Sequence, residues 1–445
     1  MLKKFDRGAG KYAVIKPADI MAAVGKHERF VAGMKDGARA SFKFSDLSHA
    51  ELAGRNLSGA DLTGCLLSEA NLAGAVLDYA CLFAADLSGA MLDDASLRGA
   101  DLRGVRLRGA QLNRAVLERA DLRDGLLVHH QNGELIPQHT EPSPSTLSNA
   151  SMSRASMRQA KLSKSFIVQS DLRDADLRAC VFVRADLSGS DLTGSNLEGA
   201  DLCDAIMTGA RLDGAILTRA LFAGTNLTNA SLLGALIDDV DLTTANLKGA
   251  EMNTRVAGIA GSIGEAVRLH REWILSCGRS GQRADFSRLN LSGIDLSHTN
   301  LSAAKLCYTM MRGVNLNGTV LAMADLAYAD LREARLVGAN VSGASLQRAT
   351  LNMADLSRLM AAPMLLKSGQ GCPTNFSNTR LVKAVLTAAD LTGCDLSSSD
   401  LTQCRLDNAT LTGASLRDAV LTHADLRGSR VETTDFRGAV GLQLD

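Results

Sequence analysis

Residues 60–64 read Ala-Asp-Leu-Thr-Gly, residues 70–74 read Ala-Asn-Leu-Ala-Gly, and residues 100–104 read Ala-Asp-Leu-Arg-Gly. These stretches share a five-residue pattern: a small residue, Asp or Asn, Leu, and two variable residues. The pattern recurs through most of the 445 residues. A period of five fits neither an α-helix nor a flat strand, which repeat about every 3.6 and every two residues. A unit this short buries no apolar face alone, so it must stack on copies of itself.

The five-residue period predicts a square coil in which each repeat forms one side and about 20 residues form one turn. We call the central apolar residue of each repeat the anchor. The anchor and the small residue two positions before it point inward. The Asp or Asn before the anchor lies near a corner, where its side chain bonds backbone groups. The two residues after the anchor point outward. Successive coils pair their backbones as strands do, about 4.8 Å apart.

The series of anchors is interrupted three times. Anchors run from Phe42 to Leu127, from Leu147 to Met252, from Phe286 to Leu356, and from Phe376 to Phe436. The first interruption leaves the five-residue frame unchanged, so we expect residues 128–146 to form an exposed loop or short hairpin inserted at one corner of a continuing coil. The second interruption, over residues 253–283, shifts the frame. The third interruption predicts another loop over residues 357–374.

Two matching helices precede the two long runs of repeats. Ile20, Val24, His27 and Val31 form one apolar stripe within an expected helix over residues 17–34. Ile263, Val267, His270 and Ile274 form the same stripe, 243 positions later, in an expected helix over residues 262–277. The chain is therefore an internal duplication, and we expect each helix to cover one end of a coil stack. We expect His27 and His270 to be structural residues that bond a coil carbonyl.

The fold class predicted from these patterns is an all-β solenoid in two segments, each preceded by a short capping α-helix. The predicted parts are an N-terminal segment over 1–39 with its helix, a first β-helix over 40–252, a linker with a helix over 253–283, a second β-helix over 284–438, and a tail over 439–445. One continuous stack with the second helix packed outside is the alternative, and the frame shift favours two stacks.

Composition excludes several classes of function. Lys plus Arg and Asp plus Glu number 48 each, so no global field attracts nucleic acid or an anionic membrane. Aromatic residues make up 4% of the chain, less than the core of a globular enzyme usually holds. No apolar run approaches the roughly 18 residues of a membrane span, and the N-terminus predicts no secretory signal. We expect a cytoplasmic protein.

The nine cysteines predict no metal site, because none of them forms a CxxC pair. Cys65, Cys180, Cys394 and Cys404 occupy the small inward position of the repeat. We interpret them as small buried residues in a reducing compartment. We expect no cofactor.

The repeats resemble the pentapeptide-repeat family, whose motif is written A(D/N)LXX, over most of the chain. This resemblance implies a right-handed quadrilateral β-helix, a form found mostly in bacteria. It also implies an alternative function, because the best-understood members are dimers that imitate duplex DNA and bind type II topoisomerases. They protect these enzymes from quinolones or inhibit them. A DNA mimic should be strongly acidic, whereas this chain is neutral, and its residues 439–445 show no dimerisation helix.

Sequence motifs give no reason to expect an enzyme. The chain contains no HExxH, P-loop or dinucleotide-binding pattern, and the recurring carboxylates are explained by turn formation. The one cluster of candidate metal ligands or catalytic residues is His129, His130 and His139, in the first loop.

The outward charges are the remaining signal for function. A basic belt around the first loop predicts a docking surface for an acidic protein partner, and its candidate residues are Arg103, Arg108, Arg123, Arg158, Arg173, Arg178, His129 and His130. A solvated surface with weak ion pairs between coils is the alternative. The main functional hypothesis is a non-catalytic scaffold that binds an unknown protein partner. Modulation of DNA gyrase is the second hypothesis, and an uncapped solenoid end would permit oligomerisation. No direct binding of nucleic acid or membrane is expected.

Overall fold

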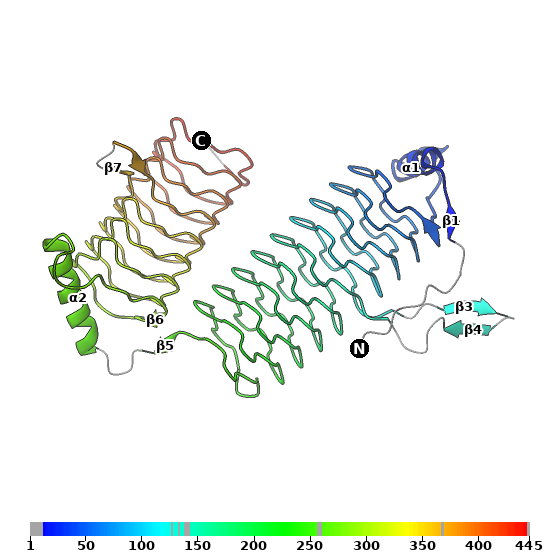
Figure 1. Ribbon diagram of the computed structural model, residues 1–445. Coiled ribbons are helices and arrows are strands. Elements are labelled where there is room, and N and C mark those ends of the chain that lie inside the picture. The colour runs from blue at the N-terminus through cyan, green and yellow to red at the C-terminus, as the bar shows by residue number, and fades with distance from the viewer. Residues whose placement is uncertain are drawn as a thin grey trace. The chain divides into compact units, whose positions relative to one another are not determined.

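The computed structural model describes residues 12–125, 128–131, 134–137, 143–255, 260–365 and 369–442, with side chains outside 126–142, 254–262 and 366–368 (Figure 1). The chain divides into two compact units. Unit 1 holds Met1–Ser231 and Leu236–Ala250, and unit 2 holds Leu232–Ala235 and Glu251–Asp445. Both units are built from the same five-residue element, and each also contains one helix.

Each five-residue element closes on itself as a turn. The N–H of Cys65 donates to the carbonyl of Leu62 at 3.1 Å, three residues earlier. Gly64, which lies between them, has a φ of +63°. This left-handed conformation favours Gly and tolerates short polar residues, which explains why Gly recurs two positions after the anchor. The corner Asp61 stabilises the same turn, since its Oδ1 accepts the N–H of Thr63 at 3.2 Å.

Parallel backbone ladders join each coil to the next. Ser41 pairs with Asp61, which pairs with Cys81, so each pairing joins residues that stand one full turn apart. The N–H of Leu62 donates to the carbonyl of Cys81 at 2.7 Å, and the N–H of Cys81 donates to the carbonyl of Ala60 at 2.9 Å. Four such ladders arise from the four elements of each turn, and they give the coil its four sides.

The interior of each coil is filled by anchors and small residues. Leu62 and Cys65 are both 0% exposed, and the same holds for most residues at their positions. The largest fully buried side chains are Phe182, Phe222, Phe286 and Phe376. Through the described coils, close packing of this kind fills the interior with side chains.

Unit 1 begins with strand β1 (Ala13–Val14) and helix α1 (Pro17–Val31). Strand β1 pairs in parallel with β2 (Ser45–Asp46) of the first coil. Helix α1 buries Ile20, Val24 and His27, the first three residues of the predicted stripe. The helix ends three residues before the predicted position 34, and Val31 is 41% exposed there.

An insertion interrupts one coil of unit 1 without ending the stack. Arg106 pairs with Thr146 in the ladder, so this turn is twice as long as a regular one. The extra residues include the antiparallel hairpin of β3 (Val128–Gln131) and β4 (Glu134–Pro137). Gly125 and Ser143 exchange two backbone hydrogen bonds of 2.9 and 2.7 Å, which close the base of the insertion.

Unit 2 repeats this plan. Strand β5 (Thr254–Arg255) pairs in parallel with β6 (Leu289–Asn290). Helix α2 spans Ala260–Leu275, against the predicted 262–277, and buries Ile263 and His270. No helix in the described part of the chain is both long and apolar enough to cross a membrane.

A shorter insertion interrupts one coil of unit 2. Ser345 pairs with Asn375 in the ladder, so this turn is half as long again as a regular one. Strands β7 (Met364–Leu365) and β8 (Gly371–Cys372) form an antiparallel hairpin in it. The regular ladder continues to Met360, which pairs with Asn340 and Asp390, so the insertion starts after the expected position 357.

Candidate interaction surface

In the part of the chain that the structure describes, the interior of the coils is filled, so the coils meet solvent through three outward positions of each repeat and through the two insertions. The outward positions are the corner residue before the anchor and the two residues after it. Around Leu112 they are Gln111, Asn113 and Arg114. Their side chains reach solvent because the anchor and the small residue fill the interior.

Where a corner Asp is followed by an anchor and an Arg, the two charges close on each other. Nε of Arg103 donates to Oδ1 of Asp101 at 2.8 Å, and Nη2 donates to Oδ2 at 2.7 Å. This bidentate pairing, which we call the Asp–Arg fork, also raises the pKa of the guanidinium. Among the described residues the arginines that form it are Arg103, Arg123, Arg173, Arg178, Arg332, Arg427 and Arg437.

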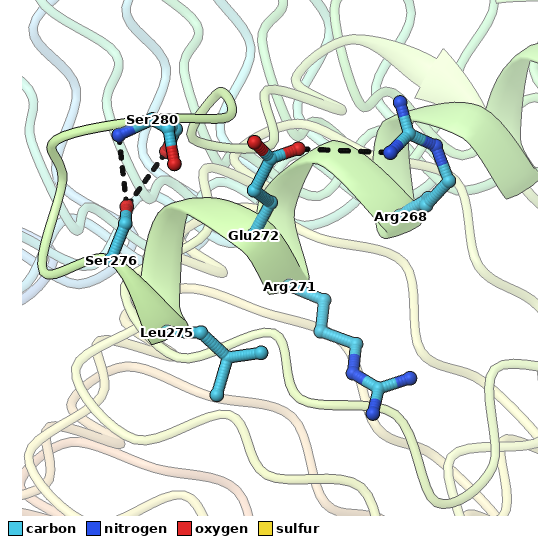
Figure 2. Close-up of a pocket in the computed structure, with 6 residues that line it drawn as sticks. All are labelled: Arg268, Arg271, Glu272, Leu275, Ser276 and Ser280. Atoms are coloured by element: carbon cyan, nitrogen blue, oxygen red, sulfur yellow. Dashed lines mark hydrogen bonds and ion pairs between the residues drawn. The ribbon is translucent and has the colours of Figure 1, made fainter.

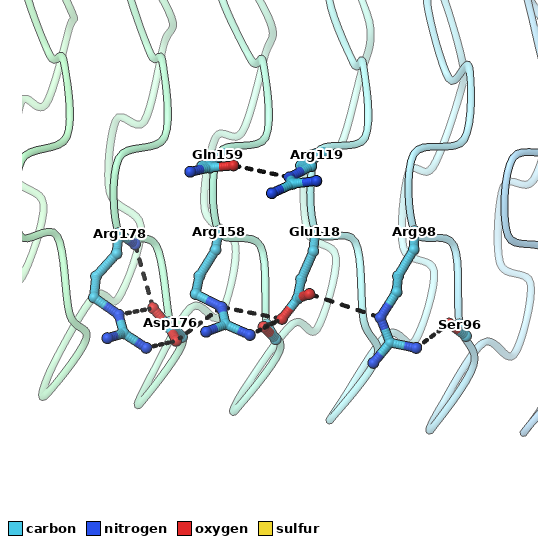
Figure 3. A network of polar contacts seen from close by, with 9 residues as sticks. Ser96, Arg98, Glu118, Arg119, Arg158, Gln159, Asp176 and Arg178 are labelled. Atoms are coloured by element: carbon cyan, nitrogen blue, oxygen red, sulfur yellow. Dashed lines mark hydrogen bonds and ion pairs between the residues drawn. The ribbon is translucent and has the colours of Figure 1, made fainter.

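Where Ser replaces the corner Asp, the arginine reaches another coil instead (Figure 3). Arg158 follows Ser156, and its Nε donates to Oε1 of Glu118 in the preceding coil at 3.0 Å. Arg98 approaches the same carboxylate from the other side, with 3.6 Å between Nε and Oε2. The hydrogen bond from Arg158 is the main reason that the pKa of Glu118 is lowered.

The six predicted arginines lie on all four sides of unit 1. The ladder places Arg103 and Arg123 on one side and Arg158 and Arg178 on a second, while Arg173 lies on a third and Arg108 on the fourth, as the pairing of their neighbouring corner residues shows. They surround the coil instead of forming one patch.

Most of the predicted basic belt is already paired within the protein. Arg103, Arg123, Arg173 and Arg178 form Asp–Arg forks, and Arg158 also lies 3.7 Å from Asp176. Arg108 differs from these five, because it makes no ion pair with any residue that the structure describes. The sequence contained a signal for this pairing, since Asp two positions before Arg marks every fork.

The predicted histidines belong to the first insertion. His129 and His130 lie in β3, opposite Ile136 and Leu135 of β4. Their side chains, and the whole of His139, lie outside the described residues, so a metal or partner role for them stays a prediction. In the described part of the chain no three His, Cys, Asp or Glu residues are grouped as metal ligands.

Both insertions are attached to the coil through buried hydroxyl groups. Ser145 donates to the carbonyl of Arg123 at 2.9 Å, next to the first insertion. Thr374 donates to the carbonyl of Ala361 at 2.7 Å, across the ends of the second insertion, and accepts the N–H of Gly343 at 2.9 Å. Fixed ends of this kind hold each hairpin at a defined place on the solenoid.

Apolar side chains surround the second insertion. Met323, Met360 and Leu365 are exposed by 39%, 47% and 76%. Methionine adapts its shape readily, so such residues suit contact with a partner. The sequence shows Met323 and Met360 at outward positions, where polar residues are usual. It does not show that Met323 lies beside the second insertion, close to Met364.

The cysteines at inward positions are buried, as predicted. Cys65, Cys180, Cys394 and Cys404 are at most 1% exposed. Burial raises the pKa of Cys65, Cys180 and Cys404 to about 12, so these thiols stay protonated and unreactive at neutral pH.

One hollow lies on the outer side of α2 and is lined by Arg268, Arg271, Glu272, Leu275, Ser276 and Ser280 (Figure 2). The hydroxyl of Ser276 accepts the N–H of Ser280 at 2.9 Å and donates to its carbonyl, so it closes the end of the helix. Arg268 pairs with Glu265 and Glu272. Because the hydroxyl of Ser276 is used to close the helix end, this hydroxyl is not placed as an activated nucleophile.

The four-sided coil, its filled interior and its paired outer charges define a β-helical repeat protein whose chemistry lies on its outside. The family model described as pentapeptide repeats matches residues 56–119, 145–253, 283–321, 324–358 and 374–438, which is more than half of the chain. The chain belongs to the pentapeptide-repeat family, and its fold is the right-handed quadrilateral β-helix in two segments that the sequence predicts.

Several solved structures are similar. HetL, a pentapeptide repeat protein involved in heterocyst differentiation regulation in the cyanobacterium Nostoc, is 23% identical, with 76% of this chain and 88% of HetL covered and a TM-score of 0.23. QnrB1, a plasmid-mediated fluoroquinolone resistance protein, is 15% identical over 51% of this chain and 95% of its own, with a TM-score of 0.27. Rfr23 from the cyanobacterium Cyanothece is 28% identical over 31% and 90%, with a TM-score of 0.19. No curated protein matches the chain.

Proposed function

We propose that the protein is a non-catalytic scaffold that presents a rigid β-helical surface and two attached loops to a protein partner. The observation that carries this proposal is the combination of a filled interior with insertions whose ends are fixed by Ser145 and Thr374. A rigid support that displays loops at fixed places is the usual design of a binding protein. Family membership supports the absence of catalysis. Nine free thiols support a reducing, cytoplasmic location.

The arginine pairing narrows the part of the surface that would bind. An arginine held in an Asp–Arg fork attracts an acidic partner weakly, since its charge is balanced at about 2.7 Å. The neighbourhood of the insertions is therefore the proposed contact surface. Arg108, which makes no ion pair with a described residue, lies two positions after Arg106, whose ladder partner across the first insertion is Thr146. The exposed methionines supply apolar area to the second insertion.

Proximity labelling in the native host with the full chain tests this proposal. One variant replaces residues 127–141 by a short Gly-Ser link, and a second replaces residues 364–372 in the same way. We expect at least one variant to lose a partner that the parent protein labels. The matched control is Arg437→Gln, which removes an Asp–Arg fork in a coil that carries neither insertion and should keep the partner. Labelling that is identical for all four proteins would refute the proposal.

A type II topoisomerase is the second candidate partner, supported by membership of the family that includes the fluoroquinolone resistance protein QnrB1. The forks reduce the support for DNA mimicry, because arginine side chains neutralise carboxylates that a DNA mimic would display. A supercoiling assay with purified gyrase distinguishes the two candidates. No effect on supercoiling or on quinolone inhibition at micromolar protein would exclude this partner.

A further inference from the structure

Each unit contains a helix that is fastened to the first coil by a buried histidine. His27 of α1 and His270 of α2 are both 0% exposed. Nδ1 of His27 accepts the N–H of Ala40 at 3.1 Å, and Nδ1 of His270 accepts the N–H of Ala284 at 3.0 Å. Both alanines occupy the small inward position at the start of a coil. The sequence predicts a bond to a coil carbonyl; in the structure Nδ1 accepts a bond from a backbone amide, and the coil backbone of Ser58 or Ser302 lies close to each ring.

This hydrogen bond requires neutral histidine. A ring nitrogen that accepts a hydrogen bond carries no proton, so the proton of each imidazole lies on Nε2. Nε2 of both residues is buried and makes no hydrogen bond of standard geometry with any residue that the structure describes. The rings stack on an aromatic neighbour, with centroids 6.1 Å apart for His27 and Phe30 and 5.6 Å apart for His270 and Trp273. Such a site suits an uncharged ring.

The charged groups around the two rings do not compensate a positive charge. Arg39 faces His27 and donates to the carbonyl of Gly59 at 2.7 Å, while Arg283 faces His270 and donates to the carbonyl of Ala303. Glu28 is the nearby carboxylate at His27, and it is engaged by Nη2 of Arg55 at 2.6 Å.

The pKa values follow from this environment. Burial is the largest effect and lowers the pKa of both histidines from 6.5, and the nearby arginines lower it further. The backbone of Ser58 opposes the shift at His27, and that of Ser302 opposes it at His270. Because protons bind the released form more readily, attachment of the helix is complete above pH 6.5 and weakens as the pH falls below it.

We propose that His27 and His270 make α1 and α2 acid-releasable caps. When Nδ1 gains a proton, its N–H meets the N–H of Ala40 or Ala284, the hydrogen bond is lost, and the helix leaves the end of its coil stack. Release exposes Val24 in unit 1 and Ile263 in unit 2, together with the edge of the first coil. The device acts once in each unit, since the same geometry occurs in both.

Hydrogen exchange of the full chain at pH of about 7.5 and about 5.5, corrected for the intrinsic rates, tests the proposal. The amides of α1 and α2 should lose protection at the lower pH by up to about tenfold, because a histidine with the ordinary pKa of 6.5 in the released form is about ten parts protonated to one part neutral at pH 5.5. The amides of the central coils should keep their protection. Unchanged protection of both helices would overturn the proposal.

His27→Asn keeps a neutral acceptor near Nδ1 and cannot take a proton. This variant should remove the pH response of α1 and leave that of α2, and His270→Asn should do the reverse. His423→Asn, at an exposed position, is the control and should change neither helix. If an Asn variant releases its helix at neutral pH, nitrogen-15 NMR of His27 and His270 in the parent protein tests the proposal instead, because it shows which ring nitrogen carries the proton. A proton on Nδ1 at neutral pH, or titration at the ordinary pKa, would overturn the proposal.

Discussion

The ring of Tyr79 lies over Gly99, the residue at the same position one coil later. A Cβ at Gly99 would stand 2.7 Å from Cε1 of Tyr79. Phe44 covers Gly64 in the same way, at 2.6 Å. Both glycines have positive φ, so they serve the turn and also leave space for the side chain of the coil before.

Gly99→Ala should therefore destabilise unit 1 more than a turn glycine alone would. Left-handed backbone costs an alanine roughly 1–2 kcal/mol, and Tyr79 must also move. Gly199→Ala is the control, since Gly199 has a φ of +64° and no atom within 4 Å of its Cβ position. Thermal melts of both variants, repeated with Tyr79→Ala, measure the coupling. Equal losses at the two glycines would contradict the prediction.

A buried Asp–Arg fork should contribute more to the free energy of unfolding than an exposed fork of the same geometry. The side chains of Asp330 and Arg332 are 1% and 16% exposed, whereas those of Asp171 and Arg173 are 25% and 50% exposed. Removing one partner of a buried pair leaves an uncompensated charge, so Asp330→Ala should cost about 3 kcal/mol. Asp171→Ala should cost about 1 kcal/mol or less. Urea denaturation measures both, and a larger loss at Asp171 would be inconsistent with this account.

Truncation of a large anchor should weaken the coils next to it. Phe182 is 0% exposed, so Phe182→Ala leaves a cavity that costs about 3–5 kcal/mol. Phe182→Leu restores the usual anchor and should cost less than about 1.5 kcal/mol. Because solenoid stability is shared mainly between neighbours, exchange should increase most in the adjoining coils. A uniform increase along the whole of unit 1 would argue for a single cooperative unit.

The carboxylates that form ion pairs between coils should make the stability of the coils depend on pH, in a lower range than the attachment of the two helices. Arg158 lowers the pKa of Glu118 from 4.5, and Arg114 lowers that of Asp94 from 3.8. A carboxylate whose folded pKa is lowered stabilises the fold above its unfolded pKa, and the contribution disappears as the pH falls through the folded value. Melting temperatures of the coils should therefore fall below a pH of about 4. Glu118→Gln should have a flatter profile there, and an unchanged profile would remove Glu118 from the explanation.

The sequence predicts the coil well because its signal is repeated. Every Leu at an anchor position specifies the same inward direction, so an error at Leu62 would be corrected by Leu82 and Leu102. The two helices are recognised because Ile20, Val24 and His27 reappear 243 positions later. The strands β1 and β5 were missed, since Ala13–Val14 and Thr254–Arg255 carry no strand pattern and pair only because a coil edge lies beside them.

The candidate surface was less predictable because it depends on where flexible side chains end. The sequence places Arg103 and Arg123 outside, but only the structure shows each guanidinium on the carboxylate two residues earlier. The bonding of His27 was missed for a similar reason. Sequence spacing identifies the buried face of a helix, and it gives no information on whether a ring nitrogen meets an amide or a carbonyl.

The two hydrogen bonds between Gly125 and Ser143 allow the inserted segment to evolve independently of the coils that support it. Residues between these two positions are free to change in number and kind, because the coils on either side receive the same two chain ends whatever lies between them. One inserted segment can thus be exchanged for another while the coils on either side stay the same. Protein engineers could insert other peptides between Gly125 and Ser143.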